Sequence, residues 1–210
     1  MTNPPVHICG RAVEGARHIC AFVHSRDEEY AIMAPYVKEA TRQNERVVQI
    51  INEDLRADHK ARMAKAGVDV EKAEASGQLS ILRWEDAYLQ GGYFDHDRML
   101  NMLQTAIRER KELGYPQMRA MANMDWALRG APGTEHLLEY EARANFVSRT
   151  TNDVFLCFYD LNKFPASTVV DVMRTHPAVI IGGVYHENPY YVEPETLLEE
   201  LVARGKAKRA

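Results

Sequence analysis

The chain has 210 residues, 46% of them hydrophobic, and its 26 basic and 30 acidic residues give a formal net charge of −4. This composition supports a folded core and excludes disordered, collagen-like and small disulfide-stapled classes. Basic residues cluster only in the short tail Arg204–Arg209, which argues against a nucleic-acid surface. Three widely spaced cysteines and the absence of a long apolar stretch predict a soluble, cytoplasmic protein without membrane association.

Short apolar runs recur along the chain and predict six strands. Together the runs are largely apolar and rich in Val, Ile, Leu and Phe, a pattern typical of parallel strands that are covered on both faces. In chain order the runs are His18–Val23, Arg46–Asn52, Leu79–Trp84, Met118–Met124, Val154–Tyr159 and Ala178–Val184.

Amphipathic segments between these runs predict helices. Ser25 and Glu28 have the spacing of a capping box, and we expect Pro35 to kink or restart the helix that follows. Further helices are expected over Asp97–Leu113, which stops at Gly114, and over Glu135–Val147, Ser167–Thr175 and Glu195–Ala203.

Strands and helices alternate, which predicts an α/β fold. We expect a three-layer architecture, with a mostly parallel sheet of about six strands and helices on both faces, joined by right-handed crossovers. No repeat, linker or change of composition divides the chain. The predicted organisation is an N-terminal extension over 1–17, a single domain over 18–203 and a basic tail over 204–210.

Residues that follow the predicted strands form the candidate ligand site, because ligands of open parallel sheets bind beyond the carboxyl ends of the strands. Aromatic rings and carboxylates are concentrated there, which favours a small uncharged or cationic organic molecule over a phosphate. For any single ring, capping of the core is the simpler explanation; the group favours a pocket. The predicted ligand-binding residues are His24, Ser25, Glu53, Trp84, Tyr88, Asp125, Trp126, Tyr159 and Asp160.

A phosphate-binding loop is not predicted. The segment Gly10–Arg17 is superficially like one, but Ala16 and Arg17 replace the required Lys and Ser/Thr, and the segment precedes the first strand. The turn that does join a strand to a helix, His24–Glu28, has no glycine and carries two acids. We therefore expect no ATP hydrolysis by the usual loop and no cofactor.

Metal binding and nucleophilic catalysis are the remaining chemical alternatives. His18 and Cys20 face the same side of one strand, and Cys157 on a later strand could join them in a soft-ligand metal site. Ordinary core packing explains the same residues, so we predict no metal and expect Cys20 and Cys157 to be buried and reduced. A nucleophilic set of Cys157, His176 and Asp160 lacks the nucleophile-elbow glycines, and we predict no catalytic residues.

Several segments, in their order and spacing, resemble the MEDS domain, the sensory domain of methanogens and methylotrophs found in the regulator of dichloromethane dehalogenase. The resemblance extends from about residue 18 to about residue 194. The segments that carry it are His18–Phe22 with Ser25, Glu28 and Glu29 behind it, Gly77–Leu79, Met124–Trp126, Tyr140–Glu141, Cys157–Asp160 and His176–Ile180.

The resemblance implies a RecA-like core, related to the circadian-clock ATPases, with a degenerate phosphate loop and a role in sensing hydrocarbon derivatives. It would place Glu53 where ATPases of the wider class keep a catalytic acid, and Asp125 where they keep a magnesium-binding acid. Val23 stands where a Tyr is common, and Ala40 and Asn44 stand where glycines are common. These departures from the family pattern affect the expected ligand more than the expected fold.

Three kinds of function are compatible with these features. The first is a sensing or signalling module for a small organic ligand that acts on a separate output protein, such as a sensor kinase or transcription regulator, with a homo-oligomer as a further partner. The alternative is a nucleotide-binding enzyme or ATPase-derived regulator that uses Glu53 and Asp125. A scaffold without any pocket is a third, weaker alternative. Neither nucleic acid nor membrane is expected as a direct partner.

Overall fold

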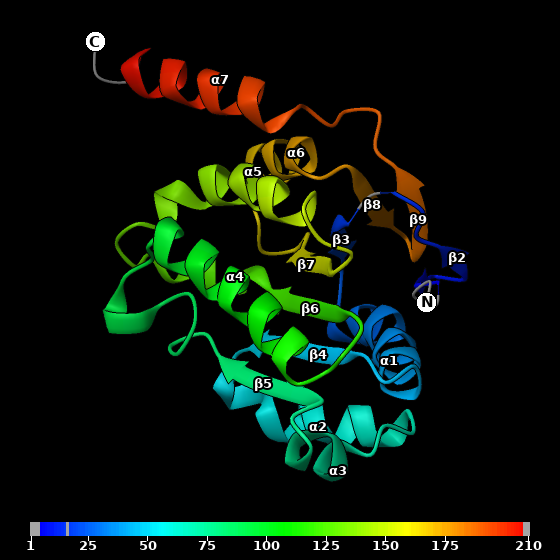
Figure 1. Ribbon diagram of the computed structural model, residues 1–210. Helices are drawn as coiled ribbons and strands as arrows, with labels where there is room; N and C mark the ends of the chain where they lie inside the picture. Colours follow the sequence, from blue (N-terminus) through cyan, green and yellow to red (C-terminus); the bar gives the residue numbers. More distant parts are fainter. Residues whose placement is uncertain (1–4, 16, 208–210) are drawn as a thin grey trace.

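The computed structural model describes residues 5–15 and 17–207 and has a seven-stranded sheet between two layers of helices (Figure 1). The strands of this sheet are β3 (His18–Val23), β4 (Arg46–Ile51), β5 (Leu79–Arg83), β6 (Met118–Asn123), β7 (Val154–Asp160), β8 (Ala178–Ile181) and β9 (Val184–Glu187).

The strands lie in the order β5-β4-β6-β7-β3-β8-β9, and all neighbours are parallel except the pair β8 and β9. The predicted α/β fold with a mostly parallel sheet is confirmed. The last predicted strand was too long: Gly182 and Gly183, at φ +57° and +73°, turn the chain back into β9. Such positive φ values suit glycine, so two glycines at the end of an apolar run indicate a hairpin turn.

Helices cover both faces of the sheet. On one face lie α1 (Arg26–Arg42), α2 (Arg56–Lys65) and α3 (Val70–Ala75), and on the other lie α4 (His96–Glu112), α5 (Leu137–Ser148) and α6 (Ala166–Thr175). The last helix, α7 (Pro194–Ala207), packs against the outer side of α5 (Figure 1). Four short 3₁₀ helices join these elements over Glu53–Leu55, Gln90–Gly92, Met124–Arg129 and Thr134–His136.

Two details of the helices differ from the sequence-based expectations. The helix α1 does not restart at Pro35, because buried Ala34 and Tyr36 on either side of it pack into the core. The helices α2 and α3 were not predicted. Only His59 and Met63 of α2 are buried, so its sequence has little apolar periodicity.

Ser25 caps the start of α1 as predicted, but the return bond of Glu28 goes to the His24 amide instead of the Ser25 amide of a standard capping box. The Ser25 hydroxyl accepts a hydrogen bond from the Glu28 amide at 3.2 Å, and the Glu28 carboxylate accepts one from the His24 amide at 2.8 Å. These bonds satisfy amides that would otherwise point out of the helix N-terminus.

The N-terminal residues form a hairpin of β1 (His7–Ile8) and β2 (Arg11–Ala12) that packs beside α1. Ile8 is buried in the same apolar cluster as α1, and the His7 ring lies 2.8 Å from a Glu39 carboxylate oxygen. At the other end of the described chain, Arg204 of the predicted basic tail belongs to α7 and pairs with Asp171 at 2.9 Å. Residues 1–4, 16 and 208–210 lie outside the described residues.

Two apolar layers fill the space between the sheet and its helices. One lies under α1, α2 and α3 and includes Val37 and Met63, and the other lies under α4, α5 and α6 and includes Leu103 and Val172. Burial of β3 and β4 along their whole length fits the continuous apolar runs in their sequences. Among the described residues, no helix combines the length and the hydropathy needed to cross a bilayer.

Candidate functional site

The carboxyl ends of β3, β4, β6 and β7 carry the polar residues predicted to bind a ligand. His24 and Ser25 follow β3, Glu53 and Asp125 begin the turns after β4 and β6, and Asp160 ends β7. At this edge the acids are paired with basic side chains of the chain itself. Lys163 bonds both Asp125 and Asp160, the latter at 3.2 Å, and Arg56 bonds Glu53 at 2.7 Å. These ion pairs offset the negative charges of the acids at this edge.

The four aromatic residues of the predicted set are buried, with at most 4% of their surface exposed. Tyr88 stacks on Trp126 with ring centroids 4.3 Å apart, and Phe94 packs against Trp126 at 4.6 Å. The Trp84 indole donates a hydrogen bond to the Asn123 carbonyl at 3.2 Å. These rings form an internal wall instead of lining a surface pocket.

Tyr88 also lines a small cavity of about 30 Å³. Tyr88, Tyr140, Met99 and Leu103 line it from the helical side, and buried side chains of the strands line it from the sheet side. A volume of about 10–15 Å³ holds one water molecule, so this space suits a very small molecule. Of the predicted ligand-binding residues, only Tyr88 lines it.

Four polar residues lie together near the strand side of the cavity. They are His18, Glu141, Cys157 and His176, and we call them the buried polar cluster. They come from β3, α5, β7 and the turn before β8, and each is at most 6% exposed. One ligand atom from each residue lies within 4.8 Å of the other three. Two members, His18 and Cys157, also line the cavity.

Only part of this cluster was predicted from the sequence. His18 and Cys157 do meet, as the metal alternative required, whereas Cys20 is not a member. Glu141 and Asn145 were missed as site residues, although two polar residues four apart on the buried side of a helix are a recognisable signal.

Hydrogen bonds fix the orientation of the buried polar cluster. The Tyr159 hydroxyl donates to one oxygen of Glu141, and the other oxygen lies 3.1 Å from His18 Nε2 and 3.6 Å from His176 Nε2. Asn145 uses its amide nitrogen to donate to backbone carbonyls, so its oxygen, 3.3 Å from His18 Nδ1, accepts from His18.

Hydrogen bonds also fix the orientation of the His176 ring. Its Nδ1 lies 2.7 Å from the Thr175 hydroxyl and 3.0 Å from the Val172 carbonyl; because that hydroxyl donates its own hydrogen to the carbonyl, Nδ1 is assigned as the donor. In the neutral ring the other nitrogen, Nε2, is then a bare acceptor, and it has no hydrogen-bond partner in the structure.

Burial shapes the protonation of the cluster. Burial raises the pKa of the Glu141 carboxyl, but His176, His18 and the Tyr159 hydrogen bond outweigh it and hold that pKa below its ordinary value. Burial also lowers the pKa of His176 to about 3. At neutral pH Glu141 is therefore a carboxylate beside a neutral His176.

The cysteine predictions are confirmed: Cys20 and Cys157 are free and buried, and burial raises the pKa of both thiols. A thiol with a raised pKa is a poor nucleophile. Asp160 bonds Lys163 and the Asn162 amide, and does not orient His176 as a nucleophilic triad would require. The nucleophilic alternative therefore has no geometric support.

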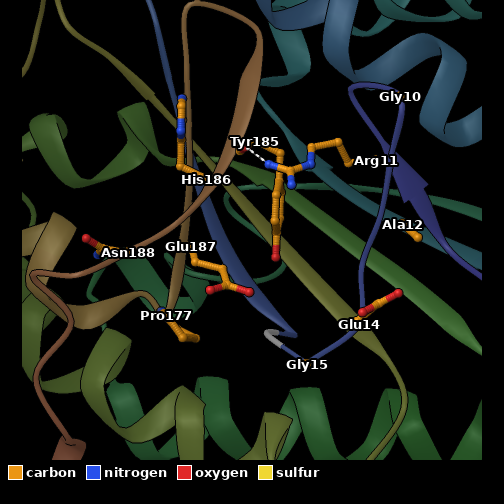
Figure 2. Close-up of a pocket in the computed structure, with 10 residues that line it drawn as sticks. All are labelled: Gly10, Arg11, Ala12, Glu14, Gly15, Pro177, Tyr185, His186, Glu187 and Asn188. Atoms are coloured by element: carbon orange, nitrogen blue, oxygen red, sulfur yellow. Dashed lines mark hydrogen bonds between the residues drawn. The ribbon is translucent and has the colours of Figure 1, made fainter.

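A larger groove of about 930 Å³ lies on the surface between β9 and the N-terminal segment (Figure 2). The Arg11 guanidinium donates to the Tyr185 carbonyl at 3.3 Å, and Figure 2 shows the carboxylates of Glu14 and Glu187 on either side of the Tyr185 ring in this view. None of the predicted ligand-binding residues lines this groove. Its polar, open wall offers little apolar area to a small organic molecule.

Comparison with known families decides what kind of protein carries these features. A family model described as MEDS, the methanogen/methylotroph, DcmR sensory domain, matches residues 17–177. The chain belongs to the MEDS family. The MEDS match begins at β3, ends just before β8, and contains all four members of the buried polar cluster, whereas α7 lies beyond it.

A solved structure supports the fold expected for a MEDS domain. The crystal structure of a KaiC-like protein from the hyperthermophilic archaeon Pyrococcus horikoshii OT3 superposes with a TM-score of 0.56 at 19% sequence identity, covering 82% of this chain and 73% of that one. At this identity the likeness concerns the fold, which is RecA-like as the MEDS resemblance implied. A search of curated proteins found no match.

We expect this MEDS domain not to bind Mg-ATP. The Glu28 carboxylate already accepts from the His24 amide, and Ser25 accepts from the Glu28 amide, so amides that a phosphate would use are occupied. Isothermal titration calorimetry with Mg-ATP should give no heat beyond that of a titration into buffer. Micromolar binding that disappears in the variant Glu53→Ala would instead support the nucleotide-binding alternative.

Proposed function

We propose that this chain is a sensing module that binds a small hydrocarbon derivative and signals to a separate output protein. The observation that carries the proposal is the cavity of about 30 Å³ inside the region matched by the MEDS family. Ligand sites of this kind combine apolar walls with a few polar groups that fix orientation. Here the apolar wall includes Met99 and Leu103, and the lining residues that carry polar groups include Tyr88, Tyr140 and His18.

The size of the cavity selects the ligand class. A space of this volume suits a molecule with one or two carbon atoms and excludes an aromatic ring without rearrangement of the wall. In this proposal Tyr88 lines the ligand compartment and Trp126 stacks on Tyr88, whereas His24, Ser25 and the paired acids do not line it.

The helix α5 connects the cavity with the outside of the molecule. Tyr140 and Ala144 of α5 line the cavity, and the opposite side of the helix packs against α7. A ligand that favours one position of α5 would therefore favour one position of α7. We propose that the output partner, a sensor kinase or transcription regulator in the cytoplasm, reads this helix pair.

Tryptophan fluorescence tests the ligand assignment, because Trp126 stacks on a ring that lines the cavity. Titration with methanol, ethanol and dichloromethane is expected to give a saturable change with at least one of them, and benzene is expected to give none. The variant Ala144→Val fills the cavity and should weaken the observed affinity about tenfold or more, since overpacking a core costs about 1–3 kcal/mol.

A matched control is available on the same helix. Ala142 is fully buried but does not line the cavity, so Ala142→Val should leave the affinity unchanged. Thermal unfolding of both variants separates loss of binding from loss of folding. If none of the small probes gives a saturable signal with the unmodified chain, or if Ala142→Val weakens binding as much as Ala144→Val, the cavity is not the ligand site.

A further inference from the structure

We propose that His18, Glu141, Cys157 and His176 form a buried binding site for a transition-metal ion of the Zn²⁺ type. The residues come from four separate elements of the fold, so the site exists only in the folded chain. Two imidazoles, one thiolate and one carboxylate are a donor set that suits Zn²⁺ and related borderline ions and that does not suit Mg²⁺ or Ca²⁺.

The distances between the donor atoms fit tetrahedral coordination. Bonds of about 2.0–2.1 Å to nitrogen or oxygen and about 2.3 Å to sulfur place the ligand atoms of a tetrahedral site roughly 3.3–3.6 Å apart. Here Glu141 Oε2 lies 3.1 Å from His18 Nε2 and 3.6 Å from His176 Nε2. Cys157 Sγ lies 3.7 Å from His18 Nε2 and 3.9 Å from Glu141 Oε2. The two other distances, from the His176 ligand atom to those of His18 and Cys157, are at most 4.8 Å, so His176 has to move to complete the tetrahedron.

An unpartnered atom points into the same space. His176 is fully buried, and its Nε2 has no hydrogen-bond partner although Nδ1 is bonded to the Val172 carbonyl. A buried polar atom without a partner is costly, and a bound ion is one of its recognised explanations. The bare Nε2 lone pair is the form of imidazole that binds a metal.

Three further hydrogen bonds fix the orientation of the ligand side chains, as outer hydrogen bonds do in known metal sites. His18 Nδ1 donates to Asn145, His176 Nδ1 donates to Val172, and Tyr159 donates to the Glu141 oxygen that faces away from the other ligands. Each of these bonds leaves the second donor atom of its residue free to face the shared centre. Metal sites recurrently hold histidine and carboxylate ligands in this manner.

Charge also favours a divalent ion at this position. The side chains of Glu141 and Cys157 are buried, and Cys157 binds a metal as the thiolate, releasing one proton to solvent. One carboxylate, one thiolate and a divalent ion sum to zero, so the filled site carries no net buried charge. This site does not depend on the proposed sensing function, because it requires no small organic ligand.

Metal content and ligand chemistry can be measured on the full chain. After removal of metal with EDTA and dialysis, the chain is expected to bind one equivalent of Zn²⁺ and, in its place, Co²⁺ with intense visible bands of a tetrahedral site and a thiolate-to-cobalt charge-transfer band. X-ray absorption of the zinc-loaded chain should show one sulfur at about 2.3 Å and three nitrogen or oxygen ligands at about 2.0–2.1 Å. No sulfur, more than one sulfur, or no stoichiometric binding overturns the proposal.

Variants assign the ligands. Cys157→Ser should abolish the charge-transfer band, and His176→Gln should weaken Zn²⁺ binding about 100-fold or more, whereas Tyr159→Phe should weaken it about 10–100-fold as loss of an outer hydrogen bond does. The control is Cys20→Ser, which changes a second buried cysteine outside the cluster and should leave the band intact. A band that survives in Cys157→Ser or is lost in Cys20→Ser contradicts the assignment. If a variant does not fold, the absorption measurement on the unmodified chain still decides.

Discussion

Replacing Arg119 with methionine is expected to lower the free energy of unfolding by about 3–5 kcal/mol, the usual cost of breaking a buried ion pair. Arg119 is fully buried on β6, where its guanidinium lies 2.5 Å from a Glu45 oxygen, 2.7 Å from Glu39 and 3.0 Å from the Tyr36 carbonyl. Methionine keeps much of the volume but leaves the Glu45 carboxylate buried without its partner. Urea unfolding at neutral pH measures the change.

Two further variants show whether the loss comes from the unpaired charge. Removing both charges in Arg119→Met with Glu45→Gln should recover part of the lost stability, because no buried carboxylate remains. The exposed pair Arg83 and Asp86, at 2.6 Å, serves as the control, and Arg83→Met should change stability by less than about 1 kcal/mol. Equal losses in Arg119→Met and Arg83→Met would show that the buried network contributes no special stability.

The variant Glu29→Gln is expected to become more stable relative to the unmodified chain when the pH is raised from 5 to 8. Glu29 is 4% exposed, and burial raises its pKa from 4.5 to about 7 against the opposing effects of Arg26 and the Asn123 hydrogen bond. Asp125 also raises this pKa, and Lys163 lowers it. The folded state thus holds a proton on Glu29 that the unfolded state releases between pH 4.5 and 7.

The direction of the effect follows from proton binding. Since the folded state binds more protons in this window, the free energy of unfolding falls as the pH rises from about 4.5 to about 7, by up to about 3 kcal/mol for this shift. Glutamine cannot ionise, so the stability of Glu29→Gln relative to the unmodified chain should increase by a similar amount between pH 5 and pH 8. Urea unfolding at both pH values measures it, with exposed Glu112→Gln as the control. A difference that does not change with pH would contradict the prediction.

The sequence predicts the sheet well because its strands are buried on both faces. Apart from His18, the run His18–Val23 has no polar residue, and it forms β3 over the same residues. Two elements were predicted wrongly. The helix α2 was missed because most of its side chains are exposed, which leaves little apolar periodicity. The turn at Gly182 was missed because it lies inside an apolar run. Tertiary contacts determine α2, whereas Gly182 and Gly183 are a local turn signal that the predicted strand ran through.

The buried polar cluster was harder to predict than the fold. Its members lie far apart in sequence, and their meeting depends on β7 and the end of α6 lying beside β3. Strand alternation could place His18 and Cys20 on one face, but only the pairing register brings Cys157 beside them. The aromatic residues at the strand ends were read as a surface pocket, because the sequence does not show that Tyr88 and Trp126 stack on each other.

The place of β3 in the sheet also sets the order in which the chain can fold. β3 is the first strand of the main sheet, yet its two neighbours are β7 and β8, near the other end of the chain. β4, β5 and β6 can pair with one another soon after synthesis, whereas β3 stays without partners until residues 154–181 have emerged. Such distant pairing is slow, because the entropy of closing a long loop is lost before the contacts form. Since β3 carries His18, the buried polar cluster is complete only after the whole sheet has closed.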